Sequence, residues 1–186
     1  YEVIAGSLSS GKKTVIAGKG GAGYKEGDCE KAEFRNLWGI TSDGGENLFV
    51  SDGDGTTDFI RKIDLSTCVV SLLASDINMT SINYPAGLEY SEGNIYVANS
   101  GIGTIHRFSV SDPNNNEIYA GAERFQNDNN RHLIGRPVEI EKIKNWIYFI
   151  ENNKLKKINI KNKTLRSIAG HSVDNYKEAR GEKARF

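Results

Sequence analysis

The feature that most constrains this chain is a set of four short segments that recurs about every 50 residues. Each segment is rich in aromatic and β-branched residues and is bounded by Gly, Asn, Asp or Ser, which are the signals of strands and turns. One family ends in alanine, at positions 17, 74, 120 and 169. The other three are residues 47–52, 94–99 and 146–151; 59–64, 104–109 and 154–159; and 37–40, 85–88 and 137–140. Four strands per repeat make one blade of a β-propeller. The sequence therefore predicts an all-β chain of four-stranded antiparallel blades.

The positions of these families divide the chain. They predict about three complete blades, and the stretch before them matches the two outer strands of a preceding blade. The last stretch is interpreted as an inter-blade loop of an incomplete next blade. A six-bladed ring would need about 300 residues at this period. We therefore expect the chain to belong to a larger, six-bladed propeller, or to complete a ring with a second copy. The predicted parts are residues 1–18 (outer hairpin), 36–74, 84–121 and 136–170 (blades) and 171–186 (loop).

The inward positions of the strands predict a core, because alternate residues of a strand point to the same face. We expect these side chains to be largely buried: Ile40, Phe49, Ile60, Ile63, Leu88, Tyr96, Ile105, Phe108, Ile140, Tyr148, Leu155 and Ile158.

The strongest internal match joins the two ends, since residues 24–34 and 176–186 are identical at seven of eleven positions. The first of these runs belongs to a longer pattern, made of Gly23–Asp28, Lys31–Phe34, Trp38–Ile40, Leu48–Asp52 and Ile60–Ile63. This pattern resembles an NHL repeat, well over residues 14–74 and more loosely over 75–170. The resemblance implies a β-propeller, often six-bladed, whose usual role is to bind protein or RNA. Some family members and structural cousins are enzymes, such as the peptidyl-amidating lyase. The third repeat departs from the pattern at Glu139, where a glycine is expected.

The charge of the chain is balanced, with 24 basic and 24 acidic residues. A neutral chain argues against general nucleic-acid binding, which needs a basic face. Residues 1–93 carry a net charge of −6 and residues 94–186 a net charge of +6. Solvated faces that drift in charge explain this asymmetry, and so do complementary surfaces between copies or toward a partner. No apolar run approaches the length of a membrane span.

Binding is expected on the face that carries the long inter-blade loops and the loops between second and third strands, here called the loop face. Loops that are merely tolerated insertions are the alternative. Asp52, Asn99 and Glu151 occupy equivalent positions, so they could form a polar arc near the channel mouth; strand-end residues that satisfy backbone groups explain them equally well. The candidate binding residues are Arg35, Asp52, Asp54, Asp58, Asn99, Arg124, Phe125, His132, Arg136 and Glu151.

Asp52, Asp54 and Asp58 place three carboxylates within seven residues, and oxygen-rich loops can hold Ca²⁺. Their order differs from an EF-hand loop, and an acidic turn that caps backbone amides is the alternative. No other cofactor is indicated. Cys29 and Cys68, the two cysteines of the chain, lack the spacing of a zinc site. The sequence leaves open whether they pair with each other.

No catalytic arrangement of Ser, His, Asp or Cys stands out. The favoured hypothesis is a non-catalytic NHL-type propeller that presents its loop face to a protein or peptide partner. The alternative is a propeller enzyme, a metal-assisted lyase or hydrolase with its site at the central channel.

Overall fold

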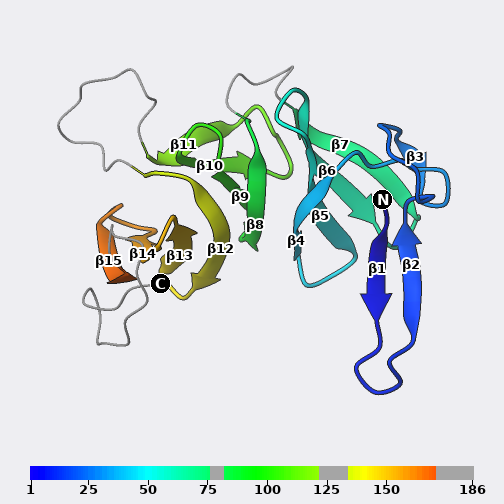
Figure 1. Cartoon of the computed structure of the whole chain (residues 1–186), viewed down its shortest axis with the longest axis horizontal. Coiled ribbons are helices and arrows are strands. Elements are labelled where there is room, and N and C mark those ends of the chain that lie inside the picture. The colour runs from blue at the N-terminus through cyan, green and yellow to red at the C-terminus, as the bar shows by residue number, and fades with distance from the viewer. Residues whose placement is uncertain (76–81, 122–133, 171–186) are drawn as a thin grey trace. The chain divides into compact units, whose positions relative to one another are not determined.

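The computed structural model describes residues 1–75, 82–121 and 134–170, and these consist of strands joined by turns (Figure 1). The chain forms two compact units, Tyr1–Pro85 and Ala86–Phe186. All strand pairs of the sheets are antiparallel. In the described part of the chain, no helix is long and apolar enough to cross a membrane.

The first unit holds a two-stranded hairpin and a five-stranded sheet with the strand order β3-β7-β6-β5-β4. In Figure 1 the hairpin extends beyond the sheet, with its turn at the far end. The hairpin strands are β1 (Val3–Gly6) and β2 (Lys13–Ala17). The sheet strands are β3 (Gly27–Asp28), β4 (Leu37–Ser42), β5 (Asn47–Gly53), β6 (Asp58–Asp64) and β7 (Val69–Ser75).

The second unit holds two four-stranded sheets, in which each strand pairs with its neighbours along the chain. The strands of the first sheet are β8 (Pro85–Ser91), β9 (Asn94–Asn99), β10 (Thr104–Ser109) and β11 (Asn116–Ala120). The strands of the second are β12 (Pro137–Ile143), β13 (Trp146–Glu151), β14 (Lys154–Asn159) and β15 (Leu165–Gly170).

The predicted all-β fold with four-stranded antiparallel sheets is confirmed, with one difference. The stretch before β4, expected to be a loop, contributes β3, which pairs with β7 through Gly27 opposite Val70 and Asp28 opposite Val69. An outermost strand carries unpaired N–H and C=O groups, and a short added strand satisfies some of them. The sheet of the first unit therefore has five strands. The predicted loop 171–186 lies outside the described residues.

A shift in register recurs at the same place in every pair of third and fourth strands. It follows Ile60 in β6, Ile105 in β10 and Leu155 in β14. The β1–β2 hairpin has the same shift after Val3. Such bulges insert one residue and bend the strand, so they are specific features of a fold. The hairpin therefore has the pairing geometry of the two last strands of each sheet.

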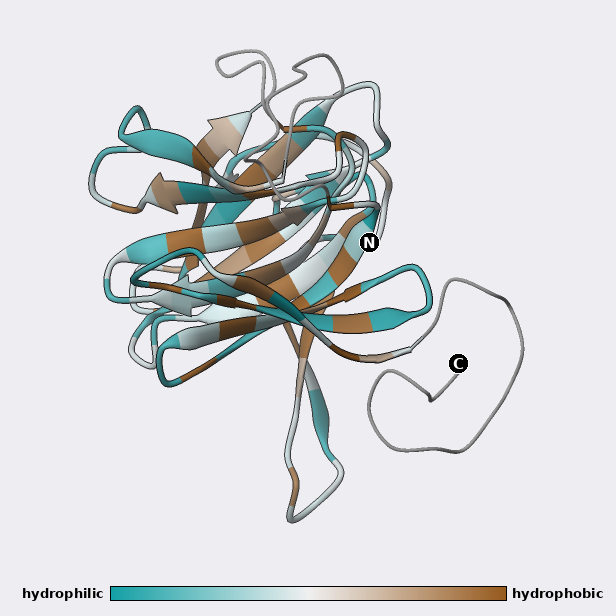
Figure 2. Ribbon diagram, turned by 90° about the vertical axis from the view of Figure 1, so that its left-hand side faces the viewer, coloured by the Kyte–Doolittle hydropathy of each residue, from teal (hydrophilic) through white to brown (hydrophobic). Residues whose placement is uncertain are grey.

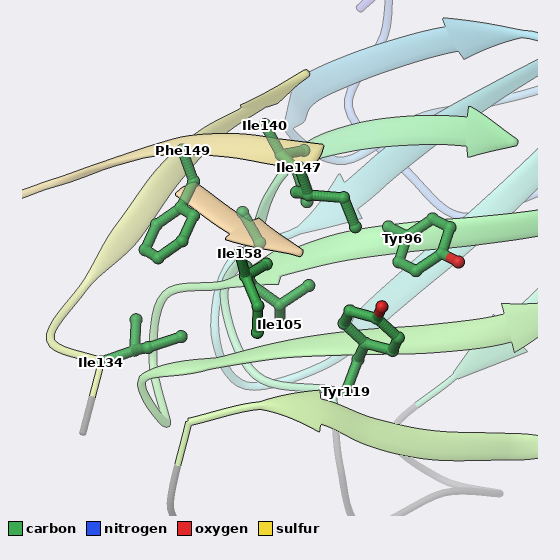
Figure 3. Close-up of a cluster of buried hydrophobic side chains, with 9 residues drawn as sticks. Tyr96, Ile105, Tyr119, Ile134, Ile140, Ile147, Phe149 and Ile158 are labelled. Carbon is green, nitrogen blue, oxygen red and sulfur yellow. The ribbon is translucent and has the colours of Figure 1, made fainter. Parts of the chain in front are cut away.

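Each unit has its own core. In the first unit Phe34, Val50 and Ile63 are buried together with Ala17 and Cys29. In the second unit Tyr96, Ile105, Ile140, Ile147, Phe149 and Ile158 gather from β9, β10, β12, β13 and β14 (Figure 3). The rings of Tyr96 and Tyr119 meet edge to face with centroids 5.1 Å apart, and the Tyr119 hydroxyl donates to the Ile160 carbonyl at 2.7 Å.

Nine of the twelve residues predicted for the core are buried. The other three correct the prediction: Tyr148 and Leu155 are half-buried, and Ile40 is 55% exposed. Exposure alternates along β4, with Trp38, Ile40 and Ser42 exposed. Hydrophilic and hydrophobic residues form bands along the strands (Figure 2). β4 is an edge strand of its sheet. The alternation of residues along such a strand does not indicate which of its two faces another segment covers.

Candidate functional site

Asp52, predicted to face a ligand, is instead part of a buried ion pair in the first unit. Its Oδ2 lies 3.2 Å from Nη1 of Arg61, and neither side chain is exposed to solvent. Its Oδ1 accepts the backbone amides of Arg35 and Asn36, each at 2.8 Å. Buried charges are stable when they are paired and hydrogen-bonded. Asp52 therefore holds the first sheet to the segment that precedes it, and it is not available to a partner.

The segment 24–34, which carries the internal match between the chain ends, forms the cover of this ion pair. The Arg61 guanidinium donates to the carbonyls of Lys25 at 2.9 Å and Glu33 at 3.4 Å. It also lies 4.7 Å from the ring centroid of Tyr24 and 5.3 Å from that of Phe34. Cation–π contacts strengthen when water is excluded. Both ends of the segment, at Tyr24–Lys25 and Glu33–Phe34, therefore contact Arg61.

The strand positions that Asp52 and Arg61 occupy also carry polar residues in the two four-stranded sheets of the second unit. Asn99 and His106 take them in the first sheet of the second unit, and both are buried. Glu151 and Lys156 take them in the last sheet, with Oε2 and Nζ 2.7 Å apart and both side chains largely buried. The expected polar arc at 52, 99 and 151 therefore consists of buried strand-end residues. Asp52 and Glu151 are each paired with a cation, and Asp52 also accepts backbone amides, as the alternative of strand-end residues that satisfy backbone groups predicts for it.

The loop between β5 and β6, residues 54–57, is fixed by Asp54 within it and by Asp58, the first residue of β6. Asp58 is buried and accepts the amides of Gly55 and Tyr84, each at 2.9 Å. Asp54 accepts the amide and hydroxyl of Thr56, at 3.0 and 2.6 Å. These hydrogen bonds, and then Arg35, hold the pKa of Asp54 below its usual value. The loop is thus an acidic turn of the kind that caps backbone amides.

The three aspartates proposed as calcium ligands therefore have separate partners. In residues 1–75, 82–121 and 134–170, no group of three or more His, Cys, Asp or Glu side chains is placed to hold a metal ion.

The same loop is bordered by an exposed cluster that the sequence analysis only partly identified. Arg35 and Asp54 form an ion pair at 2.8 Å, with 49% and 32% of their side chains exposed. Trp38 is 60% exposed and donates from Nε1 to the Gly53 carbonyl at 3.3 Å. Tyr84 is 43% exposed, and a side chain at Gly55 would overlap its ring. We call Arg35, Trp38, Asp54 and Tyr84 the loop patch.

Arg35 and Asp54 of the loop patch were predicted, whereas Trp38 and Tyr84 were missed. A sequence signal existed for Trp38, because the equivalent first-strand positions hold the smaller residues Ala86 and Val138. A large aromatic residue at a position that other repeats fill with small ones is a departure that the fold does not require.

The remaining candidates belong to the second unit. Arg136 is exposed and immediately precedes β12. Arg124, Phe125 and His132 lie outside the described residues.

No family model matches the chain, and no curated protein matches it in sequence. Its similarities are to solved structures. A chain of a nidogen/laminin complex superposes with a TM-score of 0.66 at 13% identity, over 88% of this chain and 53% of that one. A structural genomics protein of unknown function from Bacteroides thetaiotaomicron VPI-5482 gives 0.62 at 15% identity, over 89% and 43%. The computationally designed protein Ika4 gives 0.53 at 13% identity, over 83% and 90%.

The chain thus spans about half or less of the length of the first two of these structures. At such low identity the likeness shows the fold alone, which is all-β and propeller-like. The resemblance to NHL repeats stays a prediction from the sequence.

Proposed function

We propose that this chain is an NHL-type propeller module, part of a six-bladed ring, that binds a protein or peptide through its loop face and catalyses no reaction. The observation that supports this most directly is the loop patch. Two large aromatic side chains lie exposed beside an arginine, and Trp, Tyr and Arg are the residues that most often dominate protein interfaces.

The backbone beneath the patch supports the same role. Asp58 bridges the amides of Gly55 and Tyr84, so the loop is held to the residue that precedes β8. A surface that is ordered before binding loses less conformational entropy when the partner arrives. The hydrogen-bonded loop therefore gives Trp38 and Tyr84 a rigid base.

Charge indicates the chemistry of the partner. The Arg35 guanidinium is already paired with Asp54, and residues 1–93 carry a net charge of −6. Complementary charge favours encounter and specificity. We therefore expect a peptide with an apolar or aromatic side chain for the patch, flanked by Lys or Arg. One structural neighbour comes from a complex of nidogen with laminin, which fits an interaction role in general and identifies no partner for this chain.

The test is a selection of peptides from a random display library on the full chain, followed by affinity measurements by fluorescence anisotropy. Trp38→Ala and Tyr84→Ala should each weaken the selected peptide by about tenfold or more. Leu8→Ala is the matched control, because Leu8 is a fully exposed apolar residue of the hairpin turn in the same unit. Peptides that bind the Trp38 and Tyr84 variants as tightly as the unchanged chain would show that the loop patch is not the contact.

A second copy of the chain is one partner that the proposal includes. Val138 and Ile143 of β12 and Ile150 of β13 are 47%, 51% and 42% exposed, and exposed apolar residues favour association when they gather. The halves of opposite charge favour head-to-tail contact. Sedimentation equilibrium should show a mass that rises with concentration and falls with added salt. A monomer at all concentrations would exclude a ring completed by two copies.

A further inference from the structure

The two cysteines of the chain lie in register with each other across two strands. In the β3–β7 pair, Gly27 faces Val70 and Asp28 faces Val69. The next step in an antiparallel register places Cys29 opposite Cys68. A backbone hydrogen bond from the Cys29 amide to the Cys68 carbonyl, at 2.9 Å, shows that the pairing continues to this point.

This geometry is that of a disulfide site. Residues directly opposite in an antiparallel pair have Cα atoms about 4.5–5.5 Å apart, and disulfides join Cα atoms about 4.4–6.8 Å apart. Both thiols are free in the structure. We infer that Cys29 and Cys68 form an intramolecular disulfide under oxidising conditions.

The side chains approach each other as the backbone implies. Burial raises the pKa of the Cys29 thiol to about 12, and a hydrogen bond with the Cys68 side chain adds to this shift. Cys29 is 1% exposed, whereas Cys68 is exposed to solvent. An oxidant can therefore reach Cys68 and form a mixed disulfide with it. Cys29 is the neighbouring thiol that can then attack this mixed disulfide.

The other repeats do not carry a cysteine at either position. In the match between the chain ends, the counterpart of Cys29 is Gly181. The counterpart of Cys68 is Lys163, which ends the equivalent turn with a φ of 56° against 52° for Cys68. Two residues that the repeat does not require thus occur opposite each other, which favours a role for the pair.

A low-molecular-weight disulfide such as oxidised glutathione supplies the oxidant. The Cys68 thiolate attacks one glutathione sulfur, the glutathione S–S bond breaks, and one reduced glutathione leaves. The Cys29 thiol then loses its proton to water and attacks the Cys68 sulfur, which releases the second reduced glutathione. Two protein thiols are oxidised and one glutathione disulfide is reduced.

The disulfide would attach the segment 24–34, which covers the buried Asp52–Arg61 pair, to the sheet of the first unit. Cys29 follows β3 in the segment whose Tyr24 and Phe34 enclose Arg61, and its carbonyl accepts the amide of Gly18 at the end of the hairpin. Cys68 immediately precedes β7, the strand of the sheet with which β3 pairs. The disulfide therefore ties hairpin, segment and sheet together.

The experiment is titration of the full chain with mixtures of reduced and oxidised glutathione, read by intact mass and by non-reducing peptide mapping. We expect both thiols to be lost, the mass to fall by two hydrogen atoms, and one linked peptide pair to contain Cys29 and Cys68. Cys29→Ser should instead stop at a stable glutathione adduct on Cys68. Cys68→Lys, which copies the equivalent turn, should leave Cys29 unmodified while the chain stays folded.

A measurement in denaturant separates a native site from chance pairing of two thiols. The equilibrium constant for the disulfide should be larger in the folded chain by about tenfold or more, because folding has already closed the loop between the cysteines. The inference is overturned if the native chain accumulates a glutathione adduct or a covalent dimer, or if the constant is no larger than in denaturant.

Discussion

Asp52 and Arg61 form an ion pair from which solvent is wholly excluded, with 3.2 Å between Oδ2 and Nη1. The pair gives a structural role to Tyr24 and Phe34, the two aromatic residues of the segment 24–34. The segment supplies two carbonyls and two aromatic rings to Arg61, and Arg35 and Asn36, which follow it, supply two amides to Asp52.

Removing the acid of this pair should destabilise the chain severely. Asp52→Ala leaves the Arg61 charge buried without its counter-ion, which we expect to lower the free energy of unfolding by about 3–5 kcal/mol. Urea denaturation followed by tryptophan fluorescence measures this loss. Asp54→Ala is the comparison: its pair with Arg35 is partly exposed and its hydrogen bonds to Thr56 lie in an exposed turn, so we expect a smaller loss of about 1 kcal/mol. Equal effects of the two substitutions would contradict the structural role of Asp52.

The core should respond to truncation at Phe49 and not at Ile40. Phe49 is fully buried, so Phe49→Ala should cost roughly 3–5 kcal/mol of stability. Ile40 was predicted for the core and is 55% exposed, so Ile40→Ala should change stability by less than about 1 kcal/mol. Chemical denaturation of both variants checks the register of the first sheet. A large loss at Ile40 would mean that this face of β4 is covered in solution.

Acid should weaken the chain through His106. Burial lowers the pKa of His106 in the folded state, because the charged imidazole would lose its hydration. The unfolded state then binds a proton below about pH 6.5 that the folded state does not bind, so stability rises with pH in this range. The contribution is fully present above that pH and is lost as the pH falls toward the folded pKa. Urea midpoints at several pH values should show a shallower slope for His106→Gln. An unchanged slope would assign the acid sensitivity to other groups.

A methyl group at Gly55 should disturb the loop patch. Gly55 has a φ of +85°, and a side chain there would overlap the Tyr84 ring. Gly44 has a similar φ of +76° in a turn where a side chain would meet nothing within 4 Å. Gly44→Ala therefore carries only the strain of the left-handed conformation, about 1 kcal/mol. Gly55→Ala should cost more stability and should also weaken the selected peptide. Binding that is unaffected by Gly55→Ala would remove Tyr84 from the interface.

The sequence by itself determined the all-β fold and its four-stranded antiparallel sheets, although it did not indicate the short strand β3. The repeated segments 47–52, 94–99 and 146–151 fall on the strands β5, β9 and β13. These features follow from local patterns, the alternation of side chains along a strand and the turn residues between strands, and three full repetitions make the patterns unambiguous.

Only the tertiary structure decided which polar and apolar residues face solvent. Asp52 and Asp54 are two positions apart, yet one is enclosed by the segment 24–34 and the other is half-exposed at the loop patch. Likewise, Trp38 and Ile40 are large apolar residues of the kind found in cores, and both are exposed. Cys29 and Cys68 are 39 positions apart in the sequence and lie opposite each other in the fold. Burial and pairing depend on which distant segment lies against a face, and that contact is a property of the folded chain that no local pattern encodes.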